Sequence, residues 1–99
     1  MNEHAALFRL LGDEARLRIL HALSREALNV SELVEVLGIV QSGVSRHLRL
    51  LKSGGLLEEE REAGWSYYRA KPETATNGAV ALILEELRGK GAFPTTRRG

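Results

Sequence analysis

The segment 41–55 holds the side chains of this chain that are best suited to binding another molecule. It carries three basic residues, Arg46, Arg49 and Lys52, and no acidic residue. Arginine can pair with guanine through two hydrogen bonds, and serine, glutamine and arginine can also bond phosphate oxygens. The segment therefore predicts contacts with DNA through seven residues: Gln41, Ser42, Gly43, Ser45, Arg46, His47 and Arg49.

A helix must present this segment, because its apolar residues recur at helical spacing. Val44, Leu48 and Leu51 stand at positions i, i+4 and i+7, which predicts a helix from about Ser42 to Ser53 with one buried face. The small, polar and basic residues then point elsewhere, and such a helix fits a major groove about 12 Å wide. A charged helix face is more often simply solvated, so the DNA-binding interpretation depends on the neighbouring elements.

Three shorter helices are predicted before this one. The first is an apolar helix from Ala5 to Leu11. Asp13 is the candidate cap of the second helix, whose leucines recur at helical spacing. The third helix runs from Glu32 to Leu37, with Ser31 as its candidate cap and Gly38 as its end.

The connection between the third and fourth helices has the length of a helix-turn-helix turn. Roughly four residues including a glycine separate the two helices, and Ser42 is the candidate cap of the fourth. The paired glycines Gly54 and Gly55 end that helix. This spacing alone occurs in many helical proteins, and the segment that follows makes the prediction more specific.

A β-hairpin is predicted after the paired glycines. Its strands are Leu57–Arg61 and Trp65–Arg69, and Gly64 suits the tight turn between them. The hairpin carries a net charge of −3 up to Gly64, and DNA phosphates repel such a charge. Either the acidic side chains face away from DNA or the hairpin contributes little, and Arg61 and Arg69 are its plausible contacts with the DNA backbone.

The order of four helices, a hairpin and a fifth helix predicts a winged helix-turn-helix of the mainly α (α+β) class. The side chains of Tyr67 and Tyr68 are expected to pack in its core. Successive major grooves on one face of DNA lie about 34 Å apart, so we expect a two-fold homodimer. Its interface is assigned to the first and last helices: Leu7, Leu10, Leu11, Val80, Ile83, Leu84 and Leu87. The alternative is that these residues complete the core of one protomer.

Composition excludes several classes of function. The 99 residues suffice for one domain, expected at 1–90 with a flexible basic tail at 91–99, and the net charge of +1 argues against a generic polycation. With no cysteine, no metal-ligand cluster and no phosphate-binding glycine loop, we expect neither an enzyme nor a cofactor. No apolar run approaches the roughly 18 residues of a membrane span and no signal peptide is visible, so we expect a cytoplasmic protein.

Four segments, taken together, resemble the ArsR family of bacterial transcriptional repressors. They read LGDEARLRIL at 11–20, VSEL at 30–33, QSGVSRHL at 41–48 and YYR at 67–69, and the resemblance covers residues 5 to about 70. It implies a dimeric winged helix whose first and last helices form the dimer. It also implies repression through binding of a double-stranded, inverted-repeat operator, relieved when an effector binds.

The chain departs from the family where many members sense metals. The resemblance implies a cysteine cluster around the third helix, but the matching positions are Asn29, Ser31 and Val34. Other members use histidines of the last helix, and no histidine follows His47 here. Two further histidines are expected to be ordinary surface or helix residues: His4 and His21. We therefore predict no metal site of the usual kinds, and the effector could be a small molecule, a partner protein or absent.

Val40 is a second departure, because relatives often place a serine there. Ser42 would then cap the helix instead, which shifts its start by up to two residues. The alternative function is a winged-helix module that binds proteins rather than DNA, either alone or as part of a longer methyltransferase-linked chain. The acidic hairpin motivates that alternative.

Overall fold

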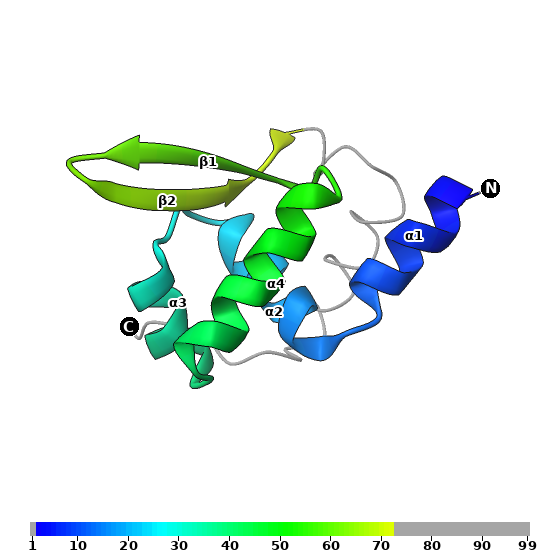
Figure 1. The fold of residues 1–99 in the computed structure, drawn as a ribbon, viewed down its shortest axis with the longest axis horizontal. Helices are drawn as coiled ribbons and strands as arrows, with labels where there is room; N and C mark the ends of the chain where they lie inside the picture. Colours follow the sequence, from blue (N-terminus) through cyan, green and yellow to red (C-terminus); the bar gives the residue numbers. More distant parts are fainter. Residues whose placement is uncertain (1, 73–99) are drawn as a thin grey trace.

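The computed structural model describes residues 2–72; residues 1 and 73–99 lie outside the described part. Four helices and a hairpin follow one another (Figure 1): α1 Asn2–Leu11, α2 Glu14–Leu23, α3 Val30–Leu37, α4 Gln41–Ser53, β1 Leu57–Glu62 and β2 Trp65–Ala70. This order confirms the predicted winged helix-turn-helix. The expected last helix and the expected tail at 91–99 lie outside the described residues. The same holds for the predicted interface residues of that helix, which are Val80, Ile83, Leu84 and Leu87.

The first two helices meet at Gly12 and Asp13. Helix α1 begins at Asn2 rather than at the predicted Ala5. The prediction started too late because it relied on apolar spacing, and the first turn of the helix is mostly polar. Asp13 caps α2 as predicted: its carboxylate accepts a hydrogen bond from the backbone N–H of Arg16 at 3.1 Å. That hydrogen bond is the main reason why the pKa of Asp13 is lowered, and the charge of Arg16 adds to it.

Helix α3 is capped by Asn29, so the prediction of Ser31 as its cap is wrong. The Asn29 side chain accepts from the backbone N–H of Glu32 at 2.8 Å, and the Glu32 carboxylate accepts from the backbone N–H of Asn29 at 2.9 Å. This reciprocal capping box needs an acceptor three residues after the cap. Asn29 has Glu32 at that position, whereas Ser31 is followed there by the apolar Val34.

The turn between α3 and α4 is short, and its two ends are closed differently. Gly38 ends α3, as predicted, in the left-handed conformation at φ 72°. Helix α4 starts at Gln41, and its N-cap is Val40, which offers no side-chain hydrogen bond. The predicted cap Ser42 therefore lies inside the first turn, because the backbone of Val40 is already the last extended residue before the helix. The predicted end is confirmed at Gly54.

The hairpin, called the wing from here on (residues 57–70), pairs its strands antiparallel in the register Glu59 opposite Tyr68. Its two-residue turn has positive φ at both Ala63 (54°) and Gly64 (84°), which is the geometry that matches the twist of paired strands. Leu28 adds a bridge to the outer edge of β2 through two backbone hydrogen bonds with Tyr68, at 2.8 and 3.0 Å. The wing is thereby anchored to the loop before α3.

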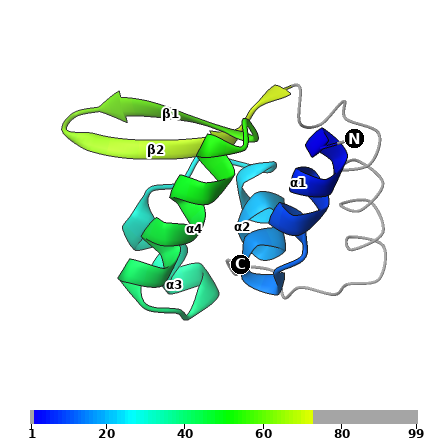
Figure 2. The same cartoon turned by 45° about the vertical axis from the view of Figure 1, so that its right-hand side comes forward.

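One apolar core joins the four helices to the base of the wing. Helix α2 lies between α1 and α4 (Figures 1 and 2), and its Ile19 and Leu20 are completely buried. Tyr68 packs against this core, whereas Tyr67 does not, so the expectation that both tyrosines are core residues holds for one of them. They are neighbours on a strand and point to opposite faces. Within residues 2–72 no helix has the length and apolarity needed to cross a bilayer.

Candidate nucleic-acid interface

Helix α4 divides into a buried stripe and an exposed stripe. Val44, Leu48 and Leu51 are buried in the core as predicted. The exposed stripe, called the reading face from here on, contains most of the residues that the sequence assigned to DNA contact. Four of them are exposed: Gln41, Ser42, Arg46 and Arg49. Two are half-buried: Gly43 and Ser45. The helix thus presents small, polar and basic side chains together, away from the core.

His47 is the exception among the predicted DNA contacts. His47 is only 9% exposed to solvent, and it lies on the buried side of α4. Its Nδ1 atom lies 3.3 Å from Nη1 of Arg16, a residue of α2. The sequence placed His47 among basic neighbours, but one helical step of 100° carries it past Arg46 and into the core. His47 is therefore a packing residue of this chain and not part of the reading face.

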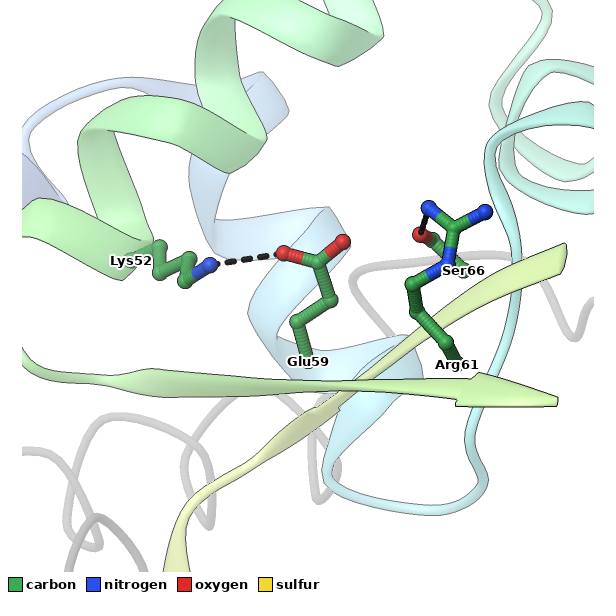
Figure 3. A network of polar contacts seen from close by, with 4 residues as sticks. All are labelled: Lys52, Glu59, Arg61 and Ser66. Carbon is green, nitrogen blue, oxygen red and sulfur yellow. Dashed lines mark hydrogen bonds and ion pairs between the residues drawn. The ribbon is translucent and has the colours of Figure 1, made fainter. Parts of the chain in front are cut away.

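The charges of the reading face are not neutralised by the rest of the described chain. Among residues 2–72, no carboxylate forms an ion pair with Arg46 or Arg49. Lys52, one turn further along, differs: its Nζ lies 2.6 Å from Oε1 of Glu59 in β1 (Figure 3). That hydrogen bond raises the pKa of Lys52 and lowers the pKa of Glu59. No local sequence pattern indicated this contact, which forms because the wing lies beside α4.

The wing has two faces of different chemistry. Its inner face carries Glu59 towards α4, together with Arg61, which donates to Ser66 Oγ at 3.3 Å (Figure 3). Its outer face carries the other acids opposite their cross-strand partners: Glu58 with Arg69, Glu60 with Tyr67 and Glu62 with Trp65. Cross-strand partners share a face, so three of the four glutamates of the wing point away from α4. This arrangement fits the first of the two expectations, that the acids face away.

The two predicted backbone contacts of the wing lie on different faces. Arg61 and Arg69 are both exposed. Arg61 is on the inner face, where it also donates to the backbone oxygen of Gly64 at 3.5 Å. Arg69 is on the outer face with Glu58 directly across from it.

Tyr68 lies on the inner face of the wing, opposite Glu59. Burial is the main cause that raises the pKa of its hydroxyl group, and the charge of Glu59 is the second cause.

Helix α1 leaves apolar surface that the described chain does not cover. Phe8 is 58% exposed, while Leu7 and Leu10 are half-buried against the core. Leu11 is 5% exposed and belongs to the core cluster, so it offers little surface to the predicted dimer interface. The apolar spacing of α1 could not distinguish these roles. The sequence-based interface prediction did not include Phe8, because this residue stands beside the leucine pattern and not within it. Its large aromatic side chain could have indicated an interface residue.

The positions that match the family's metal-sensing cluster have other structural roles. Asn29 is buried, and its side-chain Oδ1 accepts a hydrogen bond in the α3 capping box. Ser31 is exposed, and Val34 packs against the core. Within the described residues no group of three histidine, aspartate or glutamate side chains lies close enough together to hold a metal ion.

The fold and the reading face together define a class of protein, the winged helix-turn-helix DNA-binding proteins. A family model described as a helix-turn-helix domain matches residues 11–60. Among solved structures, the homodimeric winged helix-turn-helix DNA-binding domain of Mb0332 from Mycobacterium bovis, a possible ArsR-family transcriptional regulator, superposes with a TM-score of 0.75. It is 27% identical, over 91% of this chain and 84% of that one.

Curated relatives identify the family. The arsenical resistance operon repressor of Bacillus subtilis is 33% identical over 88 residues, covering 88% of this chain and 80% of the repressor. The repressor of the same name from Escherichia coli is 42% identical over 81 residues, covering 81% of this chain and 68% of that protein. The chain spans 53% of the longer ArsR1 of Pseudomonas putida, at 40% identity.

The chain belongs to the ArsR family of winged helix-turn-helix transcriptional regulators. It is a DNA-binding transcriptional regulator and not an enzyme. The resemblance found in the sequence motifs is thereby confirmed.

Proposed function

We propose that this protein is a dimeric repressor that reads an inverted-repeat operator with the reading face of α4. The single observation that carries the proposal is the acid-free exposed stripe of α4, where Arg46 and Arg49 have no carboxylate partner within the described chain. Arg46 is suited to a guanine edge and Ser45 to a base or phosphate. Arg49, one turn on, is suited to a phosphate.

A homodimer is proposed because one reading face covers too little DNA. Two copies related by a two-fold axis place two α4 helices in successive major grooves, about 34 Å apart. The exposed Phe8 and the half-buried Leu7 and Leu10 of α1 offer apolar surface for such an interface. The homodimeric Mb0332 domain, which resembles this chain over most of its length, supports the same assembly.

We propose further that this repressor does not sense arsenicals or metals through thiolates. The chain contains no cysteine, and thiolates are the ligands that soft metal ions select. Asn29, at one of the matching positions, is committed to holding the start of α3. The effector of this chain is therefore expected to be of another chemical kind.

The test selects duplexes from a random-sequence pool with the purified full chain. We expect an inverted repeat to be enriched. Its affinity should fall steeply between 50 and 200 mM salt, by roughly 10³-fold or more if the dimer contacts six or more phosphates. The double variant S45A/R46A should bind at least tenfold more weakly, because a good bidentate base contact contributes about 1–3 kcal/mol. Sedimentation velocity should show that this variant is still a dimer.

Two outcomes would contradict the proposal. If the chain binds no duplex even at low salt, the fold serves to bind a protein, and the outer face of the wing becomes the surface to examine. If the chain binds a single half-site as a monomer at micromolar concentration, the dimer and the inverted repeat are both wrong.

A further inference from the structure

The side chain of Arg16 connects three helices at one point. Its Nε donates to the backbone oxygen of Leu10 at 2.7 Å, and its Nη2 donates to that of Arg9 at 3.4 Å, both in the last turn of α1. Its Nη1 lies 3.3 Å from Nδ1 of His47 in α4. Arg16 itself belongs to α2, which lies between the other two helices (Figure 2). One guanidinium thus joins α1 to the helix that carries the reading face.

The chemistry of this contact assigns a tautomer to His47. A guanidinium has donors and no acceptor, so the Nδ1 of His47 must accept and its proton must sit on Nε2. On the other side, the last carbonyl groups of a helix lack partners within it and carry partial negative charge. Arg16 satisfies the carbonyl groups of Arg9 and Leu10 in this way. Its planar fork fixes both directions at once, which a lysine could not do.

A second contact brings α1 close to the far end of α4. The Leu10 side chain lies directly over Gly54, where a Cβ atom would come 2.5 Å from Leu10 Cδ2. The same turn of α1 therefore touches α4 at its C-cap through Leu10 and near its middle through Arg16 and His47. Two separated contacts resist rotation of α4 about its own axis as well as its displacement.

We propose that Arg16 is a positioning residue for DNA reading. Through His47 it fixes the rotation of α4 relative to α1, so that Arg46, the neighbour of His47, points to a set direction. This inference rests on the proposed dimer that reads an operator, because α1 is the helix assigned to its interface. In that dimer, the distance between the two α1 helices sets the distance between the two reading faces, because the Arg16–His47 contact holds each α4 in a fixed position relative to its α1. Arg16 itself touches no DNA.

The experiment compares R16Q with R18Q, a matched change two residues further along α2. Arg18 is half-buried, and its side chain makes no hydrogen bond within residues 2–72. We expect R16Q to bind the selected operator about 2- to 30-fold more weakly. Its affinity for a scrambled duplex and its salt slope should stay unchanged, because no phosphate contact is lost. R18Q should keep the wild-type affinity. Sedimentation and thermal unfolding confirm that both variants are folded dimers.

Variants of His47 test the contact itself. In H47N the side-chain oxygen stands close to the place of Nδ1 and can accept from Arg16, so H47N should retain most of the operator affinity. H47L removes the acceptor and should match R16Q, and the double variant R16Q/H47L should be no weaker than either alone. The ¹⁵N spectrum of the wild type should show His47 protonated on Nε2, and R16Q should lose that signature.

Several results would overturn the inference. If R16Q loses specific and nonspecific binding together and its salt slope falls by about 0.9 for each protomer, Arg16 contacts a phosphate directly. Unchanged operator affinity in a folded R16Q dimer would show that the contact does not position α4. Failure of the proposed function is seen separately, since the wild type itself would then not discriminate the operator from scrambled DNA, whereas the tautomer of His47 is read without DNA.

Discussion

Helix α4 and the wing are neighbours of opposite charge. The helix carries three cations and no acid, while the strands of the wing carry four glutamates and two arginines. The helix sorts its residues by a period near 3.6, so apolar residues face the core and the cations face out. The wing sorts its residues by a period of two, so three of its glutamates face away from α4. An acidic wing is therefore compatible with a DNA-binding helix beside it.

The comparison also shows that the two elements are not independent. Glu59 is the one glutamate of the wing that faces α4, and it holds Lys52 at 2.6 Å. Glu59 on the inner face of the wing thus neutralises Lys52, one of the three cations of α4. Arg46 and Arg49 remain as the positive charge that is available to DNA.

Charge reversal on the two elements should produce the largest contrast. R49E places an acid on the reading face, and we expect operator affinity to fall roughly 10- to 100-fold, in the range of a lost side-chain contact with DNA. R61E makes the same change on the inner face of the wing, and its loss should be severalfold smaller. Fluorescence anisotropy with the selected operator measures both. Equal losses would show that the wing contributes to DNA binding as much as the helix does.

A change at the start of α4 should separate stability from DNA binding. Val40 is 70% exposed and provides no side-chain cap. V40S and V40D each add a capping oxygen and should raise the free energy of unfolding by about 0.5–2 kcal/mol. V40D also adds a negative charge beside Gln41 and Ser42, and we expect it to bind DNA severalfold more weakly than V40S does.

Urea unfolding and operator titration of the two Val40 variants provide the measurement. The uncharged V40S is the control, because it caps the helix without changing its charge. If V40D binds the operator as well as V40S, the start of α4 lies too far from the DNA backbone to sense a charge.

The smallest effect is expected from releasing Lys52. E59Q removes the partner of this lysine, so Lys52 becomes free to pair with a phosphate. We expect slightly tighter binding at low salt and a salt slope steeper by about 0.9 for each protomer that gains a phosphate contact. E60Q makes the same chemical change on the outer face and should leave the slope almost unchanged. A steeper slope in E60Q would mean that overall charge, and not this ion pair, governs binding.

The pH dependence of stability provides a control for the same pair. The pKa of Glu59 is lowered in the folded protein, so its contribution to stability is present above the ordinary glutamate pKa, about 4.3. It is lost as the pH falls through the lowered folded value. Wild type should therefore be slightly more stable than E59Q at neutral pH, and the two should converge in acid. A constant difference down to low pH would contradict the assigned pair.

Local sequence patterns predicted most of the described fold. Glycine at residue 38, aspartate at 13 and the spacing of Val44, Leu48 and Leu51 each act within one or two turns, and the structure agrees with them. The cap of α3 went to Asn29 rather than Ser31 because a capping box depends on two residues together.

Contacts between distant elements could not be predicted in the same way. The side-chain partner of His47 is Arg16, which stands on another helix. The loss of Lys52 as a free cation follows from Glu59, on a strand. Leu11 and Phe8 are both apolar residues of one helix, yet one lies in the core and the other is exposed. Such differences depend on how whole elements pack, and no spacing within a single segment encodes them.

The alternation of the two faces limits how the wing can change length during evolution. Deleting one residue between Leu57 and Glu62 would turn the rest of β1 over, since each step along a strand reverses the side of the sheet. Glu60 or Glu62 would then stand beside α4, while Arg61 would point outwards. Insertions and deletions in this wing should therefore be tolerated in pairs, or at the turn of Ala63 and Gly64, where the paired strands can lengthen or shorten together.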